Sequence, residues 1–259
     1  MTTQVRAMWA LTVAAAVVLI ASAMVLVIRD VQEQPAAALP AVISTVPPTT
    51  TTTVPQPEVP VTTMLATPDG VIRAYDTPAG NDIGTVGTWY GHPMTMPIVQ
   101  ESGEWLLVRR PERPNGSIGW VRRSEVTITS TAYRIVIRLP ETRLFVYKDG
   151  FELFSAPVGI GKDSTPTAPG SFFVAVIETP GPHGYGPIVL DTSGHSETIR
   201  SWQGSGDAIT ALHGPISASS AARIGTTGAR ISNGCIRMHT EDQLKLDVIP
   251  LGTPVDIIA

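Results

Sequence analysis

The chain has 259 residues and a formal net charge of -4. A weakly acidic protein without a stripe of basic side chains lacks the electrostatic footprint of a nucleic-acid binder, so we exclude nucleic acid as a partner. Neither a GxxxxGK[ST] nor a GxGxxG loop occurs, and we expect no nucleotide cofactor. One cysteine and five histidines at scattered positions give no CxxC or HExxH spacing, so we also expect no metal site.

The N-terminal part is predicted to be a membrane anchor followed by a spacer. Residues 8–28 are almost purely apolar, which matches the roughly 20 residues that a helix needs to cross a bilayer. We predict a short cytoplasmic tail at residues 1–7 and a retained, single-pass signal anchor at 8–28, with late cleavage near residues 36–38 left open. Residues 29–63 are rich in proline and threonine and predict a stiff, extended linker. The remaining residues are therefore expected on the extracytoplasmic, cell-wall side of the membrane.

Residues 64–130 are predicted to form a small all-β unit. Short apolar runs are separated by Gly, Pro, Asn and Asp turns, at residues 71–75, 96–99, 105–108 and 119–121. The segment 103–126 resembles bacterial SH3-like barrels that accompany cell-wall enzymes. Trp105, Trp120 and Tyr90 could line a groove for a peptide or a sugar, but paired tryptophans in small barrels are more often core side chains, and we assign no binding residue here.

Residues 131–259 are predicted to form a second, mainly β unit with few helices. Alternating apolar residues predict strands at 133–139, 171–177 and 253–258. The Asp-Gly pair at 149–150 predicts a hairpin between strands 143–147 and 151–156. A helix is expected at 241–248, opened by a capping box between residues 240 and 243.

The single cysteine, Cys235, lies in the part of the chain that we expect beyond the membrane, where thiols are usually paired in disulfides. An unpaired thiol there is exposed to oxidation, and nucleophilic catalysis explains its retention. The alternative is a buried cysteine acting as a small hydrophobic residue. Its neighbours Ser232, Asn233 and Gly234 favour a tight polar turn over core packing, which supports the nucleophile.

A catalytic cysteine also needs a base or a positively charged neighbour, because a thiol of ordinary pKa, about 8.5, is only slightly ionised at neutral pH. His213 follows an apolar run and is predicted at a strand end, where a rigid element can direct its side chain. We take His213 as the first candidate and His239 as the second. The remaining histidines are His183 and His195 in loops and His92 in the preceding unit.

Three motifs in the second unit carry a family resemblance. ALHG (residues 211–214) and SNGCIRM (residues 232–238) together resemble the signature of bacterial L,D-transpeptidases. TPTAPGSFF (residues 165–173) is loosely similar to the TPxGxF stretch of that family, so the resemblance runs from about residue 133 to residue 258. It implies a β-rich L,D-transpeptidase catalytic domain over residues 131–259. One departure is Asn233, where many members carry a second histidine.

The resemblance implies peptidoglycan stem peptides as substrates and 3→3 cross-links as products. The thiolate of Cys235 would attack the carbonyl of the third residue of a tetrapeptide stem, form a thioester and expel the terminal D-alanine. His213 would act as base and acid, oriented by the Gly214 carbonyl. The backbone amides of Asn233 and Gly234 would form an oxyanion hole. An amine of a neighbouring stem would then attack the thioester.

The resemblance also implies substrate-binding residues and inhibitors. Arg237 lies two residues after Cys235, on the same face of an extended chain, and would clamp a stem carboxylate; a structural arginine is the alternative. Ser232 and Tyr185 are further candidates, Tyr185 within a flap over the site. Carbapenems, as β-lactams, are implied to acylate the cysteine.

Three other functions were weighed. An L,D-carboxypeptidase forms the same acyl-enzyme but uses water as acceptor, and the sequence does not distinguish it. A papain-like peptidase is disfavoured, because such enzymes place cysteine before histidine, whereas His213 precedes Cys235. A non-catalytic, membrane-tethered wall-binding module accounts for the anchor, spacer and barrel but leaves the thiol unexplained.

Overall fold

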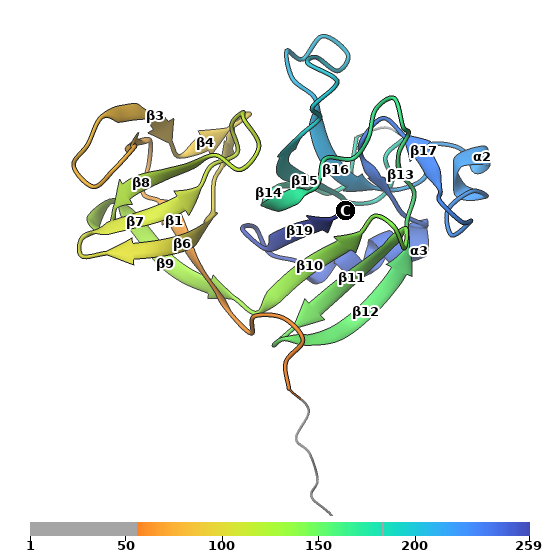
Figure 1. Ribbon diagram of the computed structural model, residues 1–259, viewed down its shortest axis with the longest axis horizontal. Helices are drawn as coiled ribbons and strands as arrows, with labels where there is room; N and C mark the ends of the chain where they lie inside the picture. The colour runs from red at the N-terminus through yellow and green to blue at the C-terminus, as the bar shows by residue number, and fades with distance from the viewer. Residues whose placement is uncertain (1–55, 183) are drawn as a thin grey trace, which may run out of the picture. The chain divides into compact units, whose positions relative to one another are not determined.

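The computed structural model describes residues 56–182 and 184–259, and Pro55–Ala259 form one compact unit. The fold of this part is mainly β with few helices, as predicted (Figure 1). The predicted tail, transmembrane helix, most of the linker and His183 lie outside the described residues. In the described ranges no helix combines the length and hydropathy of a membrane span. The membrane anchor stays a prediction.

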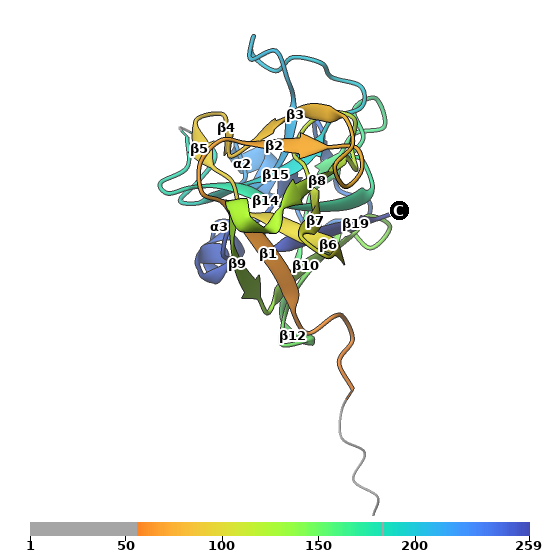
Figure 2. The same cartoon turned by 90° about the vertical axis from the view of Figure 1, so that its left-hand side faces the viewer.

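The region predicted as a small all-β unit forms a seven-stranded antiparallel sheet in the order β3-β2-β8-β7-β6-β1-β9. Figure 2 has this sheet facing the reader. Its strands are β1 (Thr63–Pro68), β2 (Ile72–Tyr75), β3 (Asp82–Val86), β6 (Met96–Ser102), β7 (Trp105–Arg109), β8 (Ile118–Arg122) and β9 (Val126–Thr131). A small hairpin, β4 (Thr88–Trp89) and β5 (His92–Pro93), and the short 3₁₀ helix η1 (Arg123–Glu125) complete it.

The three aromatic residues singled out in this region differ in burial. Trp120 is buried and Trp105 is half-buried, with Tyr75 in an edge-to-face contact with its ring and Arg122 over its face. Tyr90 is exposed and has a positive φ of 48° in the β4–β5 turn. The assignment of this region as an SH3-like barrel remains a prediction.

The second sheet has eight strands in the order β12-β11-β10-β19-β14-β15-β16-β18. Figure 1 labels these strands except β18. The strands are β10 (Tyr133–Arg138), β11 (Arg143–Lys148), β12 (Phe151–Pro157), β14 (Gly170–Glu178), β15 (Val189–His195), β16 (Ile209–His213), β18 (Ile236–Arg237) and β19 (Pro254–Ile258). A separate parallel pair joins β13 (Ile160–Gly161) to β17 (Arg230–Ser232). Two neighbouring pairs within the large sheet are also parallel, β10 with β19 and β16 with β18.

Local sequence explains much of this sheet. The predicted hairpin forms between β11 and β12, and both turn residues, Asp149 and Gly150, have positive φ, as a two-residue type I′ turn requires. Ile135 and Ile137 are fully buried and belong to the core cluster, together with Leu190 of β15, Leu212 of β16 and Ile236 of β18. Hydrophobic alternation therefore fixes which face of each strand the core occupies.

The core of the first sheet is continuous with the second. Phe173 and Ala175 of β14 are buried in the same hydrophobic cluster as Met96, Leu106 and Val121 of the first sheet. The boundary predicted between residues 130 and 131 is therefore not a break in packing. It separates two sheets that share buried side chains within one compact unit.

The helices are short. They are α2 (Ala218–Ala221), α3 (Thr240–Gln243) and the 3₁₀ helix η2 (Leu244–Val248). The predicted capping box was wrong, because the N-cap residue of α3 is His239 and no side chain caps it. The Gln243 side chain is fully buried and donates to the carbonyls of Tyr185 and Ile188 instead. Gln243 therefore makes hydrogen bonds to a distant loop and not the predicted one to the start of its own helix.

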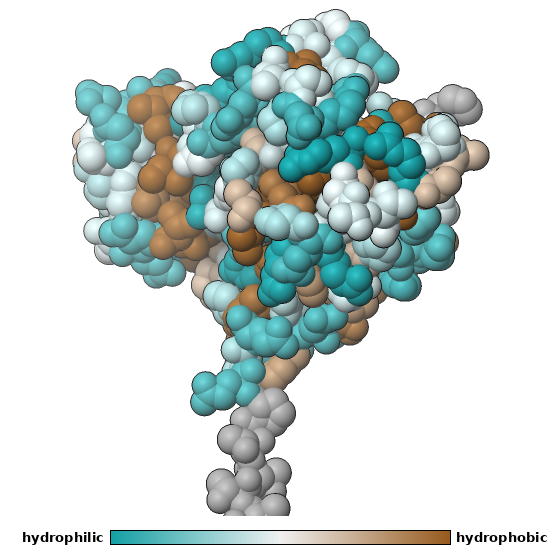
Figure 3. All heavy atoms as spheres, turned by 45° about the vertical axis from the view of Figure 1, so that its right-hand side comes forward, coloured by the Kyte–Doolittle hydropathy of each residue, from teal (hydrophilic) through white to brown (hydrophobic). Residues whose placement is uncertain are grey.

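The described surface carries scattered apolar side chains. Figure 3 shows patches of hydrophobic surface between hydrophilic ones on the face in view. Val71, Leu153 and Trp202 are among the large apolar residues that are more than one-third exposed. Isolated residues of this kind are normal on a protein surface.

Candidate active site

One cavity of about 560 Å³ brings together most of the residues singled out by their motifs. Its walls include Cys235, His213, Arg237, Asn233, Gly234 and Tyr185. These residues come from β16, β18 and two loops that are distant in the sequence. The remaining two candidates, Ser232 and Gly214, lie next to this set without lining the cavity.

Strand pleating directs the polar side chains of β15, β16 and β18 into the cavity. In β16, Leu212 enters the core, whereas Ala211 and His213 line the cavity. The parallel partner β18 follows the same alternation, because Ile236 is in the core and Arg237, opposite His213, lines the cavity. The alternation of a β-strand thus separates a dry core face from a polar face within each strand.

Cys235 sits in a turn that its neighbours hold closed. The Ser232 hydroxyl donates to the Cys235 carbonyl at 2.5 Å and accepts from the Gly234 amide at 3.1 Å. Gly234 has a φ of 121°, which side chains with a Cβ rarely adopt. Ser232 is buried, and because its hydroxyl donates its only proton to the Cys235 carbonyl, it shapes the turn. This corrects its predicted place among the substrate-binding residues.

The stretch resembling TPxGxF braces the same turn from the other side. The Thr167 hydroxyl donates to the Gly234 carbonyl at 2.8 Å and accepts from the Gly161 amide at 2.9 Å. The Lys162 amide donates to the Ser232 carbonyl at 3.0 Å. The two motifs, about 60 residues apart in the sequence, are therefore parts of one hydrogen-bonded support for the cysteine.

The predicted oxyanion hole needs a correction at Gly234. Its amide is already bonded to Ser232 Oγ and is not free to bind an oxyanion in this conformation. The amides of Asn233 and Cys235 make no hydrogen bond within residues 56–182 and 184–259. These two N–H groups are the better candidates, because an oxyanion hole requires donors that are aimed at the reacting carbonyl and otherwise free.

His213 is buried and oriented by the next residue. Its Nδ1 lies 2.7 Å from the Gly214 carbonyl. A carbonyl only accepts, so Nδ1 carries the proton and Nε2 of the neutral ring is left as the acceptor. The Tyr185 ring packs edge-on against the imidazole, with centroids 4.7 Å apart. This is the tautomer that a general base needs.

Burial makes the cysteine and histidine a neutral pair at rest. Burial lowers the pKa of His213 to about 4, opposed by the Gly214 hydrogen bond and assisted by Arg237. Burial also raises the pKa of the Cys235 thiol, opposed by the Ala211 amide and assisted by the carboxylate of Asp191. Both shifts disfavour a thiolate–imidazolium ion pair. A reaction that used this pair would transfer the proton to His213 during attack by sulfur and not before it.

The Tyr185 loop is held in place by Gln243 and Gly214. The Tyr185 carbonyl accepts from the Gly214 amide at 2.8 Å and from Gln243 Nε2 at 2.9 Å. A Cβ on Gly214 would lie 2.7 Å from Gln243 Oε1, so this position has no room for a larger residue. Gln243 was missed as a site residue, because its sequence position suggested only a helix cap.

Arg237 is anchored by the protein as well as facing the cavity. Its Nη1 donates to the Ser220 hydroxyl at 3.0 Å and to the Ile231 carbonyl at 2.9 Å. Burial lowers the pKa of its guanidinium, opposed by the Cys235 thiol. The structural and substrate-binding roles weighed for this residue are therefore compatible, because the anchoring uses one of its nitrogens.

The other described histidines lie away from the thiol. His239 caps α3 and does not line the cavity. His195 is buried between Asp207 and the Pro111 carbonyl, and His92 is exposed in β5. His183 lies outside the described residues. Among the described histidines, His213 alone shares a cavity wall with Cys235.

Two acidic residues on the cavity wall, besides Glu178 of β14, were not anticipated. Asp191 of β15 lies opposite Ala211 of β16 and lines the cavity. Asp207, also on the wall, binds the side chains of Tyr90, Arg113 and His195. Neither belongs to a recognisable motif, and only strand pairing and loop packing bring them to the site.

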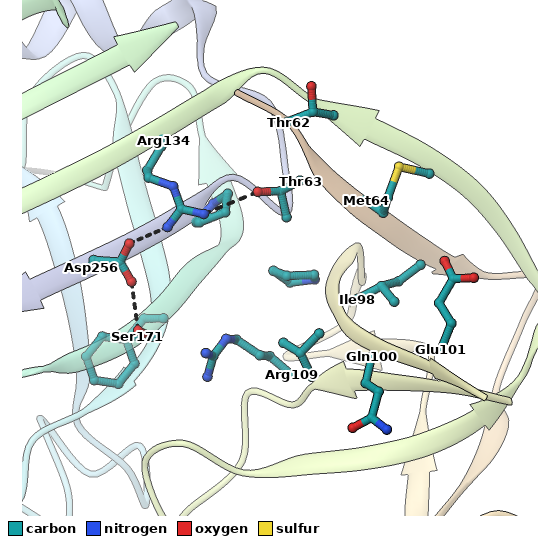
Figure 4. A pocket seen from close by; sticks show the side chains of 14 residues that line it. Thr62, Thr63, Met64, Ile98, Gln100, Glu101, Arg109, Arg134, Ser171 and Asp256 are labelled. Carbon is teal, nitrogen blue, oxygen red and sulfur yellow. Dashed lines mark hydrogen bonds and ion pairs between the residues drawn. The ribbon is translucent and has the colours of Figure 1, made fainter. Parts of the chain in front are cut away.

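A second cavity, of about 400 Å³, lies elsewhere and contains no candidate nucleophile (Figure 4). Figure 4 shows Arg134 bonded to Asp256 and Thr63, with Ser171 on the other oxygen of Asp256. These contacts tie β10, β14 and β19 to β1. The hydroxyl of Ser171 has no histidine among the residues around this cavity, so the network is structural.

Comparison with known proteins finds that the second sheet is similar to one family. Residues 132–257 match the model of the family described as the L,D-transpeptidase catalytic domain, YkuD. A relative named YkuD, from Bacillus licheniformis, is 33% identical over 127 residues, which cover 48% of this chain and 65% of the relative. The match thus spans somewhat less than two thirds of that relative. The family comparison confirms the resemblance for the catalytic domain.

Solved structures are also similar, at low identity. An L,D-transpeptidase from Mycobacterium smegmatis is 15% identical, with a TM-score of 0.40, over 75% of this chain and 99% of that one. L,D-transpeptidase 3 from Mycobacterium tuberculosis, in complex with a faropenem-derived adduct, is 17% identical, with a TM-score of 0.41, over 66% of this chain and 76% of that one.

Proposed function

We propose that this protein is a peptidoglycan L,D-transpeptidase that forms 3→3 cross-links through a thioester on Cys235. The match of residues 132–257 to the L,D-transpeptidase catalytic domain supports the proposal. The arrangement of Cys235, His213 and the free amides around one cavity carries the proposal. Acyl transfer needs a nucleophile, a base and oxyanion donors that can all reach one substrate carbonyl, and these groups surround one cavity.

In the first half-reaction, Cys235 attacks the carbonyl of the third residue in a tetrapeptide donor stem. His213 Nε2 takes the thiol proton as the carbon–sulfur bond forms, and the Asn233 and Cys235 amides bind the oxyanion. The imidazolium then gives its proton to the departing nitrogen. D-Alanine leaves and the thioester remains.

In the second half-reaction, an amine from a neighbouring stem attacks the thioester. His213, neutral again, accepts a proton from the attacking nitrogen and returns it to sulfur as the thiol leaves. An amide bond forms and the resting thiol is restored. Arg237 holds a stem carboxylate with the guanidinium nitrogens that its anchoring leaves free.

The test is to incubate residues 56–259 with a purified tetrapeptide muropeptide and to weigh the products. A cross-linked dimer of tetrapeptide and tripeptide stems supports transpeptidation. A bare tripeptide with no dimer would assign the L,D-carboxypeptidase reaction instead, and unchanged substrate would favour the wall-binding module. Cys235→Ala is the control, and turnover above about one per cent of wild type in that variant would contradict the mechanism.

A carbapenem gives a direct test of the nucleophile. A strained lactam carbonyl resembles the scissile amide, so it is expected to acylate Cys235 and add one adduct to the intact mass. An adduct that persists in Cys235→Ala would place the nucleophile elsewhere.

We also propose that residues 8–28 anchor the protein in the cell membrane, with residues 29–63 as spacer and the catalytic domain on the cell-wall side. The apolar length and the Pro/Thr-rich composition support this arrangement. Fractionation of the full chain, with protease added to intact cells from which the wall has been removed, tests it. Recovery of the full chain in the soluble fraction would refute it.

A further inference from the structure

A carboxyl group lines the proposed catalytic cavity without an assigned task. Asp191 lies on β15, next to Leu190, which is in the core. Across the sheet it pairs with Ala211 of β16, and His213 is two residues further along the same face. Its side chain therefore enters the cavity on the same face as the imidazole.

Asp191 is close enough to the thiol to influence it. The Ala211 amide contacts the sulfur of Cys235, and Asp191 is the strand partner of Ala211. The negative charge of Asp191 raises the pKa of the thiol and so opposes its ionisation. A residue whose charge opposes ionisation of the thiol does not assist acylation, the first half-reaction. Its role is therefore sought in the second half-reaction.

The carboxyl of Asp191 also lacks a protein partner. Within the described part of the chain, no hydrogen-bond donor or cation is found against it. Burial, assisted by the charge of Glu178 on β14, raises its pKa to about 7. Glu178 lines the cavity too, so this side of the site has two carboxyl groups. Asp191 is half-buried, and its carboxyl oxygens stay accessible from the cavity, where a cationic ligand could pair with them.

The cavity is consequently polarised around the thiol. Arg237 provides positive charge from β18, and Asp191 and Glu178 provide negative charge from β15 and β14. The other titratable groups that line the cavity are His213, Cys235, Tyr185, Tyr90 and Asp207. Asp207 is already paired with Arg113 and His195, unlike Asp191. A stem carboxylate and a stem ammonium would bind at opposite ends, with the scissile carbonyl between them.

We propose that Asp191 is the acceptor-binding residue of this enzyme, which holds the primary aliphatic ammonium of the incoming stem and removes one proton from it before attack. This assignment rests on the proposed function. The step balances, because the ammonium and the carboxylate become a free amine and a carboxylic acid. The amine then attacks the thioester, and Asp191 later releases its proton to solvent. Glu178 strengthens the attraction for the cation without contacting it.

The assignment predicts a change in the fate of the acyl-enzyme. Asp191→Asn should lower the ratio of cross-linked dimer to hydrolysed tripeptide at least tenfold at pH 7.5, by raising the KM for the acceptor. Alkylation of Cys235 by iodoacetamide should become faster, because the opposing charge is gone. Asp247→Asn, an exposed aspartate outside the cavity, is the matched control and should change neither reading.

The decisive experiment follows D-alanine release and product masses separately, with one donor stem and a series of acceptor concentrations. In wild type, the dimer-to-tripeptide ratio should rise with an inflection near pH 7, and Asp191→Asn should lose that inflection. An unchanged ratio in Asp191→Asn, or a wild-type profile without the inflection, overturns the assignment. An increased KM for the donor with an unchanged ratio would place the ammonium on the donor and also overturn it.

The same experiment keeps the two proposals apart. Absence of D-alanine release in wild type refutes the proposed function, and this inference with it. Release and dimer formation in wild type, combined with normal partition in Asp191→Asn, leaves the proposed function intact and removes only the role of Asp191. The wild-type pH profile is measured without a variant. It therefore tests the assignment even if Asp191→Asn folds poorly.

Discussion

At the scale of single residues, the site combines a thiol and an imidazole that are both kept neutral by burial. The Nδ1 contact to Gly214 fixes the tautomer, and the Tyr185 ring fixes the plane of the imidazole. A neutral pair protects the thiol from oxidation at rest, because the thiolate is the reactive species. The proton then moves only when a substrate carbonyl is present.

His213→Ala should therefore slow acylation of Cys235 by roughly two to four orders of magnitude, the usual contribution of a positioned general base. The rate of carbapenem adduct formation, followed by intact mass, measures it. His239→Ala is the control, because that side chain lies outside the cavity. The opposite pattern of losses would transfer the base to His239.

Burial of His213 and Asp191 should also shape the dependence of stability on pH. Burial lowers the pKa of His213 from 6.5 to about 4, so the unfolded chain binds a proton more tightly than the native state. The free energy of unfolding therefore keeps its full value above pH 6.5 and falls by roughly 3 kcal/mol as the pH drops to 4. The pKa of Asp191 rises from 3.8 to about 7, so the native state binds its proton more tightly and gains roughly 4 kcal/mol as the pH drops from 7. The two trends oppose each other between pH 4 and 6.5.

Variants separate these trends. In urea titrations, Asp191→Asn should become less stable as the pH falls from 6.5 to 4, because only the histidine contribution remains. His213→Gln should become more stable over the same range. Parallel slopes in both variants would mean that neither group titrates as its burial requires.

At the scale of elements, loops are fixed by single buried side chains rather than by regular structure. Gln243 of α3 holds the loop before β15 through the carbonyls of Tyr185 and Ile188. Thr167 holds the turn that carries Cys235. Such contacts position the reactive groups more firmly than a loop could by itself.

Gln243→Ala should lower the free energy of unfolding by about 2 kcal/mol, since the buried Ile188 carbonyl loses its donor and the Tyr185 carbonyl keeps only the Gly214 amide. The variant should also slow acylation through displacement of the Tyr185 loop. Chemical denaturation and adduct formation measure the two effects. Gln100→Ala, at an exposed position of β6, should do neither. Loss of stability with unchanged acylation would show that the loop does not position the site.

At the scale of the whole molecule, the described part is one compact unit in which the first sheet contributes to the wall of the site. Arg113 donates to the Ser196 carbonyl at 2.8 Å, to the Ile199 carbonyl at 3.2 Å and to Asp207 at 2.9 Å. Asp207 also binds Tyr90 and lines the cavity. The first sheet therefore supports the loop between β15 and β16.

Arg113→Ala should lower the free energy of unfolding by roughly 2 to 3 kcal/mol, because the Ser196 and Ile199 carbonyls lose their side-chain donor and Asp207 loses its guanidinium partner. The KM for stem peptides should rise as the β15–β16 loop loses its support. Arg123→Ala removes an exposed ion pair with Glu101 and should change stability by less than about 1 kcal/mol. Equal effects of the two variants would contradict a supporting role for Arg113.

Much of the second sheet could be predicted because its signals are local. The Asp149–Gly150 turn, the alternation in β10 and the strand end at His213 each depend on a few adjacent residues. The motifs around Cys235 and His213 indicated the family for the same reason, since acyl transfer requires particular residue types at short spacing. Gly234 was expected in the oxyanion hole, but the Ser232 hydroxyl, two residues away, takes its amide.

The sequence by itself determined the β-rich character, the nucleophile motif and the position of His213 at a strand end, because hydrophobic period and turn chemistry act over a few residues. Tertiary structure alone decided that Gln243 binds the Tyr185 loop, that Arg113 reaches Asp207, and that Asp191 stands beside the thiol. These contacts join segments dozens of residues apart. Sheet register and burial select the partners in these contacts. Both depend on the packing of the whole chain, so no short sequence pattern predicts them.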